Sequence, residues 1–202
     1  MKRGRRSTKP WAALAVAIVG LLGASQVSEG DLLRLGRAVW QVVQSFEEPK
    51  RRPAGEPFAG HPRVIDGDTF DLEGIRVRMQ GIDALEHDQQ CNRSGGGRFA
   101  CGAAAREELT TLIGGREVTC TPDGTLTHGR TVAVCTVRQP DGSVLDLNEA
   151  MVRSGLAFDC PRYSKKRYAA AEAEAKAAKE GAWAGRFTYP WSHRDRAGAC
   201  GR

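Results

Sequence analysis

The sequence predicts an α+β fold, because segments with the alternation of β-strands are interleaved with segments that have helical periodicity. Two apolar runs rich in β-branched residues, Val64–Leu72 and Ile75–Gln80, are separated by a turn at Glu73-Gly74. The other expected elements are strands over 117–121 and 131–138 and helices over 103–113, 146–155 and 165–180. Strands and helices of this number suit a small sheet covered by helices.

Capping residues mark the ends of the predicted helices. The first helix stops at Gly114. Asp146 is placed to cap the second helix, which runs to Gly155. Ser164 is placed to cap the third, an alanine-rich helix that Gly181 ends.

Charged residues are concentrated around the first two predicted strands. Asp66 and Asp68 lie two residues apart, so on a regular strand both side chains point to one face, unless the intervening glycine forms a bulge. Arg78 lies inside the second strand, and Asp83 and Glu86 follow it in a loop. Carboxylates gathered beside a partly buried arginine cost free energy unless a cation and an anion normally bind there. The alternative is an ordinary hairpin with solvated carboxylates and a surface salt bridge.

These residue types suit the chemistry of a metal-assisted phosphodiesterase. Asp68 and Asp83 offer the oxygen ligands that Ca²⁺ prefers. The guanidinium of Arg78 matches the geometry of a phosphate, and Glu86 is left to orient or deprotonate a water molecule. An EF-hand is excluded, because the glycine and the terminal glutamate that its loop requires are absent at their offsets from Asp66.

Four motifs together resemble the staphylococcal nuclease (thermonuclease) family. They are Val-Ile-Asp-Gly-Asp-Thr at 64–69, Val-Arg-x-x-Gly-Ile-Asp-Ala-x-Glu at 77–86, His-Gly-Arg at 128–130 and the run over 146–157. The resemblance covers roughly residues 62 to 191, in the order of the family. It implies a five-stranded OB-type barrel with three helices. It also implies a calcium-dependent nuclease without sequence specificity, which cleaves DNA, and RNA as well, to products with 3′-phosphate ends.

The resemblance assigns roles to the acidic positions. By position, Asp68 and Asp83 match the carboxylates that bind Ca²⁺ in the family, and the backbone carbonyl of Ala84 matches a further ligand. Glu86 matches the proposed general base. Leu85 stands where the family usually has proline, so a looser loop is expected between Asp83 and Glu86.

The resemblance also assigns residues that contact the substrate. Arg78 and Arg130 match the two phosphate-binding arginines of the family. His128 replaces a tyrosine near the bound nucleotide, and it is expected to stack on a base more weakly. Tyr163 and Tyr168 are further candidates, placed by a looser correspondence. The expected partner is single-stranded or denatured DNA or RNA, bound by a monomer.

Two functions of other classes compete with this interpretation. One is a non-catalytic OB-fold module that binds nucleic acid or protein, against which the complete set of charged positions argues. The other is a scaffold anchored in the cell envelope. Net charge does not decide between them: of the formal +6, a large share lies before residue 10, residues 61–163 are net acidic, and the remaining basic excess follows Ser164.

The chain before residue 61 predicts export. Residues 1–25 combine a basic start with an apolar run of about 14 residues, short of the roughly 20 that span a bilayer. A signal peptide and secretion into the periplasm or the medium are therefore expected, with an uncleaved inner-membrane anchor facing the periplasm as the alternative. Residues 26–60 contain an amphipathic helix over 31–48, with a face suited to the membrane surface or to another copy, and a proline-rich linker. The nuclease domain is expected over 61–202.

The six cysteines indicate an oxidising compartment, since their number is even and an export signal precedes them. Their spacing favours bridges that would each stabilise the fold by about 3–4 kcal/mol in the chain-entropy model. A zinc site is the alternative, but the sequence contains no Cys-x-x-Cys pair. The expected pairs are Cys91 with Cys101, Cys120 with Cys135, and Cys160 with Cys200.

Overall fold

The computed structural model describes residues 34, 36, 37, 39 and 52–201. The chain divides into two compact units, Met1–Glu48 and Pro49–Arg202, and only the second is described below. The expected signal peptide or anchor lies outside the described residues, as does most of the helix expected over 31–48. None of the helices in the described ranges has the length and apolarity needed to span a bilayer.

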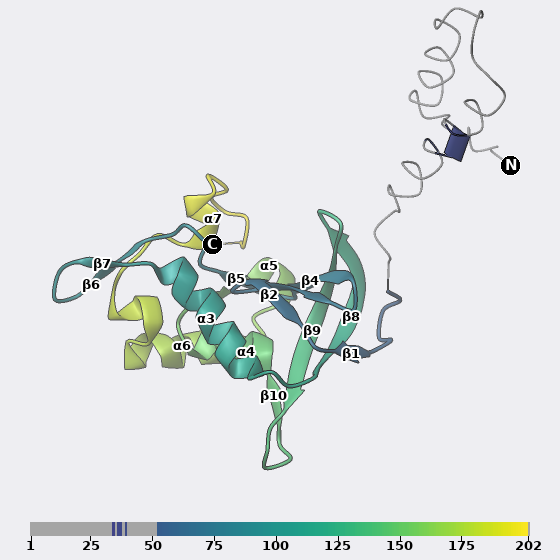
Figure 1. Ribbon diagram of the computed structural model, residues 1–202. Helices are drawn as coiled ribbons and strands as arrows, with labels where there is room; N and C mark the ends of the chain where they lie inside the picture. The colour runs from purple at the N-terminus through teal and green to yellow at the C-terminus, as the bar shows by residue number, and fades with distance from the viewer. Residues whose placement is uncertain (1–33, 35, 38, 40–51, 202) are drawn as a thin grey trace, which may run out of the picture. The chain divides into compact units, whose positions relative to one another are not determined.

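An α+β architecture is observed, with one large mixed sheet at its centre (Figure 1). The strands of this sheet lie in the order β1-β8-β9-β4-β3-β2. Strand β10 pairs with residues 136–138 of β9, beyond the residues that pair with β4. Neighbouring strands are antiparallel except for β4 and β9, which run parallel. The bounds are β1 Phe58–Gly60, β2 Arg63–Asp66, β3 Thr69–Leu72, β4 Ile75–Met79, β8 Val118–Thr127, β9 Arg130–Arg138 and β10 Val144–Asp146.

The described strands form an open path and not the closed five-stranded barrel that was expected. The chain leaves the main sheet after β4, at Gly81, where φ is +74°. The next strand, β5 (Ile82–Ala84), pairs instead with β11 (Ala157–Asp159) in a two-stranded sheet of its own. This departure carries Asp83 out of the large sheet and into the neighbourhood of the C-terminal segments.

The first strand begins inside the stretch that was expected to be a linker. Phe58 and Gly60 are buried and the residue between them is exposed, so β1 has the alternation of a strand at the edge of a core. Phe58 lies opposite Cys120 in the antiparallel pair with β8.

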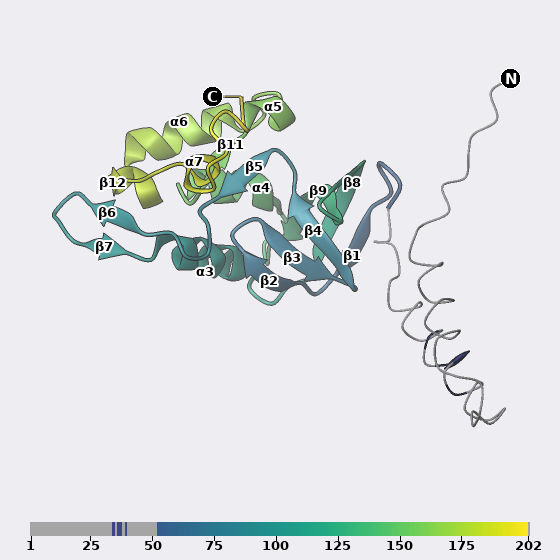
Figure 2. The same cartoon turned by 90° about the horizontal axis from the view of Figure 1, so that it is seen from above.

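Helices cover the sheet at two places (Figure 2). Helix α3 (Cys101–Ile113) packs on β2 and ends at Gly114 in the left-handed conformation, as the sequence predicted. Helix α4 (Leu147–Arg153) packs on β9 and β11, and the Asp146 side chain accepts a hydrogen bond from the Glu149 amide at 3.1 Å. A third sheet, formed by β12 (Gly185–Arg186), β6 (Cys91–Arg93) and β7 (Arg98–Phe99), extends away from the main sheet.

The helix expected over 165–180 is present only over Ala169–Ala178, and Ser164 is not its cap but the last residue of a separate short helix. Helix α5 (Pro161–Ser164) ends where Lys165 and Lys166 adopt φ values of +57° and +69°. The Ser164 hydroxyl caps this break by accepting a hydrogen bond from the Lys166 amide at 2.9 Å. Helix α6 (Ala169–Ala178) starts afterwards and packs on α4.

The C-terminal segments are held by a cluster of aromatic side chains. After η1 (Gly181–Ala184), the chain passes through this cluster and forms the short helix α7 (Pro190–His193). Ring centroids within the cluster are 4.5–6.3 Å apart, and Tyr189 stacks on the buried Trp191. Such packing stabilises a segment that has little secondary structure of its own. The members are Phe158, Trp183, Phe187, Tyr189 and Trp191.

Three disulfides are present, and they join the same cysteines that the spacing favoured: Cys91–Cys101, Cys120–Cys135 and Cys160–Cys200. The second bridge joins directly opposed residues of β8 and β9. The third closes a loop of 40 residues and ties the C-terminal end to the start of α5. Three bridges in a domain of this size are typical of an extracellular or periplasmic environment.

Candidate active site

Asp68 lies in the tight turn between β2 and β3, not on a strand with Asp66 as the sequence had suggested. Strand β2 ends at Asp66, whose carboxylate accepts a hydrogen bond from the Asp68 amide at 3.0 Å. A Cβ atom at Gly67 would lie 2.8 Å from the Cβ atoms of both Ala84 and Ala105. Glycine therefore lets the turn approach β5 and α3 closely, which presses the Asp68 side chain into the protein.

The buried Asp68 carboxylate is surrounded by hydrogen-bond donors. Its Oδ2 accepts from the Ala84 amide at 2.8 Å and its Oδ1 from the Thr69 hydroxyl at 2.9 Å. The Arg78 guanidinium donates to the same Oδ1. Burial raises the pKa of Asp68 to about 7, although the charge of Arg78 opposes the rise.

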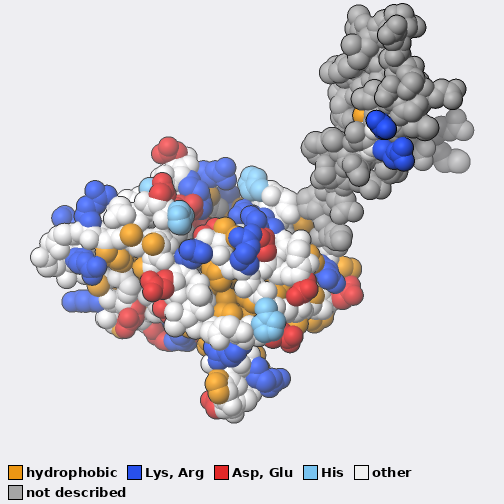
Figure 3. Space-filling model, viewed as in Figure 1, with side chains coloured by type: hydrophobic (Ala, Val, Ile, Leu, Met, Phe, Trp, Pro, Cys, Tyr) orange, Lys and Arg blue, Asp and Glu red, His pale blue; other side chains and the backbone are white. Residues whose placement is uncertain are grey.

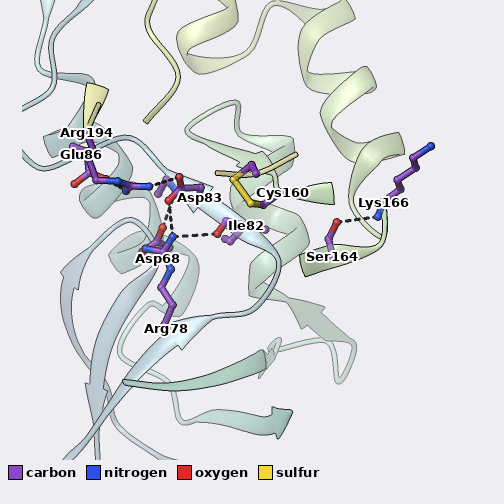
Figure 4. The surroundings of a disulfide bond; sticks show 11 residues. Asp68, Arg78, Ile82, Asp83, Glu86, Cys160, Ser164, Lys166 and Arg194 are labelled. Atoms are coloured by element: carbon purple, nitrogen blue, oxygen red, sulfur yellow. Dashed lines mark hydrogen bonds and ion pairs between the residues drawn. A yellow bond between two sulfur atoms is a disulfide. The ribbon is translucent and has the colours of Figure 1, made fainter. Parts of the chain in front are cut away.

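Arg78 joins the two buried carboxylates of the site (Figure 4). It projects from β4, next to Thr69 of β3 on one side and Val132 of β9 on the other. Its second amino group donates to Asp83 Oδ1 at 2.5 Å and to the Ile82 carbonyl at 3.3 Å. Burial would lower the pKa of Arg78, but Asp68 and Asp83 outweigh it and the pKa is raised. Both aspartate side chains are 3% exposed, so this guanidinium balances charge that water does not reach.

A second arginine, which the sequence analysis missed, completes the cluster. Arg194 follows α7 and donates to Asp83 Oδ2 at 2.5 Å and to Glu86 Oε1 (Figure 4). It lies 108 residues from Glu86 along the chain, so no local pattern connects the two. The signals available in the sequence were the basic tail after Ser164 and the cysteine at 200, which together bring the tail back to the site.

The loop between Asp83 and Glu86 is firmly held, which corrects the expectation that Leu85 would loosen it. Leu85 is buried, and its amide donates to the Leu156 carbonyl at 3.1 Å, a bond that proline has no hydrogen to make. The Glu86 amide donates to the side chain of the buried Gln89 at 3.1 Å. These contacts fix the direction in which Glu86 leaves β5.

Arg130 lines the same cavity as the acidic cluster, which has a volume of about 810 Å³. The residue opens β9, and its Nε donates to the Thr127 carbonyl at 3.2 Å. Burial lowers the pKa of Arg130, and the positive charge of Arg78 lowers it further. The two arginines that the resemblance paired are therefore brought together around one cavity.

Of the three aromatic candidates for substrate contact, two line the cavity and one is buried in the core. His128, in the turn between β8 and β9, and Tyr163, in α5, both line the cavity, and Tyr163 is 57% exposed. Tyr168 is fully buried in the core and does not line the cavity, because the break after α5 turns it inward against α4. Burial and the nearby Asp146 raise the pKa of its hydroxyl. Tyr168 is thus a core residue.

The donor set fits a hard divalent cation. Asp68 and Asp83 offer carboxylate oxygens on either side of the Arg78 guanidinium, which donates to each from a different nitrogen atom. Within the described ranges no three His, Cys, Asp or Glu residues form a metal-binding group, so most ligands would have to come from a backbone carbonyl, water or substrate oxygens. Calcium tolerates such a mixed and irregular shell. The Ala84 carbonyl as a ligand stays a prediction.

Comparison with known proteins places the chain in a family. The sequence model described as staphylococcal nuclease homologue matches residues 76–185, which is more than half of the chain. The chain belongs to the staphylococcal nuclease homologue family. A relative in Rhizobium meliloti (strain 1021), named succinoglycan biosynthesis protein ExoI, is 34% identical over 148 residues, which cover 73% of this chain and 75% of the relative.

The staphylococcal nuclease homologue match contains much of the site but not all of it. Arg78, Asp83, Glu86 and Arg130 lie within the matched residues. Arg194 lies beyond the end of the match at residue 185, as does the second half of the Cys160–Cys200 bridge. Asp68 lies before the start of the match at residue 76, so the site combines matched residues with residues on both sides of the match.

Proposed function

We propose that the protein is a calcium-dependent nuclease that hydrolyses phosphodiester bonds in single-stranded or denatured DNA, and in RNA, with little sequence specificity. The observation that carries the proposal is Arg78, which lies between two buried carboxylates in a cavity that Arg130 also lines. A stable fold has little need of this buried cluster, since apolar residues of similar volume often stabilise a protein as well or better. A bound cation would balance the charge of the carboxylates, and a bound phosphate would balance that of the arginines.

Each residue has a defined task in this reaction. Asp68, Asp83 and the Ala84 carbonyl would hold Ca²⁺, which supplies positive charge against a phosphate oxygen when bound. Arg78 and Arg130 donate hydrogen bonds to the phosphate oxygens and stabilise the charge that develops on them in the transition state.

Glu86 accepts a proton from the attacking water. Within the described part of the chain, its Oε1 is bonded to Arg194 while Oε2 receives no hydrogen bond and is left for the water. The water oxygen forms the new bond to phosphorus as the bond to the 5′ oxygen breaks. The products are a 3′-phosphate end and a 5′ hydroxyl that takes its proton from solvent.

The proposal extends to location and assembly. The three disulfides support secretion or residence in the periplasm, with an anchor in the inner membrane as the alternative and contact with the membrane surface through the N-terminal segment. We expect a monomer, since the site draws all its residues from one chain.

Digestion of heat-denatured DNA by the purified full-length chain tests the proposal. We expect cleavage in Ca²⁺, none in excess chelator, and none by Arg78→Ala in Ca²⁺. Arg76→Ala is the matched control, because Arg76 lies two residues away on the same strand and pairs with Asp71, which is only partly buried. Calcium binding is measured separately by titration calorimetry, with Asp83→Asn expected to weaken it.

Each contrary result has its own meaning. Equal digestion in every sample would point to a contaminating nuclease. Binding of DNA without cleavage would support the non-catalytic OB-fold module.

The name of the relative favours a second candidate, a part in polysaccharide biosynthesis. In that case the basic residues of the cavity would hold an anionic polysaccharide, and the chain would not cleave nucleic acid. Degradation or binding of an anionic polysaccharide in the same assay, with no cleavage of DNA, would support this candidate over the nuclease.

A further inference from the structure

The C-terminal segment Pro190–Cys200, called the strap below, is fastened at both ends beside the cavity. At its start the buried Trp191 stacks on Tyr189 with ring centroids 4.5 Å apart. At its end Cys200 is bonded to Cys160, and its carbonyl accepts a hydrogen bond from the Arg162 amide at 3.1 Å. The match to the family model ends at residue 185, before the strap begins.

Basic side chains from the strap and from α5 line one cavity together. Figure 3 shows Lys, Arg, Asp and Glu side chains spread over the face of the domain that carries α3 and β2, whereas α5 lies on the opposite side (Figure 2). Arg194 is engaged with Asp83 and Glu86. The remaining cavity-lining cations, Arg196, Arg162 and Lys165, are exposed, and none of them pairs with a carboxylate among the residues that the structure describes.

The exposed cations on the rim of the cavity are placed to bind a longer anion than the single phosphate that Arg78 and Arg130 would hold. With one phosphate bound, Arg162, Lys165 and Arg196 would have no anionic partner, although the Lys165 ammonium donates to the Arg162 carbonyl at 3.1 Å. A polymer with a phosphate at every repeat would supply one to each. The exposed Tyr163 lies between Arg162 and Lys165 in the sequence and offers a ring on which an unpaired base can stack. This combination suits a single strand better than a duplex, whose bases are already stacked.

We propose that the strap and α5 form a track for the phosphate backbone of single-stranded nucleic acid, in which Arg162 and Arg196 bind phosphates that flank the one being cleaved. This inference rests on the proposed function and specifies where the substrate lies. Arg194 joins the strap to Asp83 and Glu86, and so positions the track next to the proposed general base. The Cys160–Cys200 bridge holds the track in place.

Salt dependence of binding tests the track directly. Binding of a fluorescent oligothymidylate to the full-length chain is measured by anisotropy, in chelator so that no cleavage occurs, over a series of salt concentrations. Each phosphate contact to a single strand contributes about 0.7 to the slope of log K against log salt. We expect Arg162→Gln/Arg196→Gln to lower the magnitude of the slope by about 1.4 and to weaken binding about tenfold or more at low salt.

The matched control is Arg98→Gln/Arg186→Gln, which removes the same charge from exposed positions on β7 and β12, neither of which lines the cavity. We expect its slope to equal that of the wild type. A second variant, Cys160→Ser/Cys200→Ser, releases the strap, and its slope is expected to fall toward that of Arg162→Gln/Arg196→Gln. Circular dichroism shows whether each variant is folded.

The outcomes separate this inference from the proposed function. An unchanged slope in Arg162→Gln/Arg196→Gln would overturn the track, and continued cleavage of DNA would leave the nuclease proposal standing. An equal loss in the Arg98→Gln/Arg186→Gln control would also overturn the track, since bulk charge would then explain the binding. Wild-type protein that neither binds nor cleaves the oligonucleotide would overturn both. Preference for alginate, with the same dependence on Arg162 and Arg196, would replace nucleic acid with an acidic polysaccharide.

Discussion

The β3–β4 hairpin carries two clusters of aspartate and arginine that differ mainly in their exposure to water. Near the turn, Asp71 is paired with Arg63 and Arg76, and its side chain is 24% exposed. At the other end, Arg78 meets Asp68 and Asp83, both 3% exposed. A hydrogen bond from Arg76 lowers the pKa of Asp71, whereas burial raises that of Asp68 to about 7.

The same ionic groups therefore have opposite energetic consequences on one hairpin. Water screens the outer cluster, so its ion pairs form at little cost and contribute little. The inner cluster has lost its water and depends on each partner to balance the others. The difference in burial therefore distinguishes ordinary surface ion pairs from a candidate functional site. The sequence alone does not show it, because both clusters consist of Asp and Arg on neighbouring strands.

Replacing Arg78 with lysine should have the largest effect. Arg78→Lys keeps the charge but loses the planar fork that reaches both carboxylates and the phosphate, so we expect kcat for DNA cleavage to fall by about 10²–10³. Arg76→Lys, in the outer cluster, should change kcat less than about twofold. Steady-state cleavage of a fluorogenic oligonucleotide measures both, and equal losses would abolish the distinction between the clusters.

Glu86→Gln should lower kcat nearly as much, by about 10²–10⁴, because the amide cannot accept the proton of the water. Oligonucleotide affinity in chelator should stay within about threefold of the wild type, since glutamine retains the shape of the side chain. A variant that cleaves at the normal rate would remove Glu86 from the mechanism.

The turn that buries Asp68 gives a smaller effect, on stability. Gly67→Ala places a methyl group against Ala84 and Ala105, and we expect unfolding in urea to lose about 1–3 kcal/mol of free energy. Gly95→Ala is the control, since no atom lies within 4 Å of a Cβ added there. If both variants unfold at the same urea concentration, close packing does not hold this turn.

The smallest effect is expected in the outer cluster. Because the folded pKa of Asp71 lies below its unfolded value, its stabilising effect is present above the unfolded pKa and disappears as pH falls through the folded one. Asp71→Asn should therefore cost about 1 kcal/mol or less at pH 7 and nothing at pH 2. Thermal unfolding at the two pH values measures this, and a cost that grew on acidification would contradict it.

Local patterns in the sequence were enough to place the residues around β4 and β5. The alternation of β4 puts Arg78 among buried neighbours. Asp83 and Glu86 follow at short range, although Asp83 lies in the short strand β5 and not in the loop that the sequence suggested. The disulfide partners were also within reach of spacing arguments, since Cys120 and Cys135 lie on adjacent strands.

Features that depend on distant contacts could not be predicted in this way. Arg194 reaches Glu86 only because aromatic packing and a disulfide bring the C-terminal segment back. Tyr163 and Tyr168 were equal candidates for substrate contact in the sequence. In the structure, the left-handed residues between α5 and α6 direct Tyr168 into the core, whereas Tyr163 is exposed. Strand β5 pairs with β11, which lies far from it in the sequence, so local patterns could not predict the two-stranded sheet that they form.

The covalent tie at Cys200 has a consequence for when the enzyme becomes competent. A newly made chain with reduced thiols lacks the bond that returns Arg194 to Asp83 and Glu86. Under the proposed export, this bond would form only after the chain has left the cytoplasm, where thiols are kept reduced. Under the proposed nuclease function, we then expect Arg194 to reach Asp83 and Glu86 only outside the cytoplasm, which would protect the DNA and messenger RNA of the producing cell.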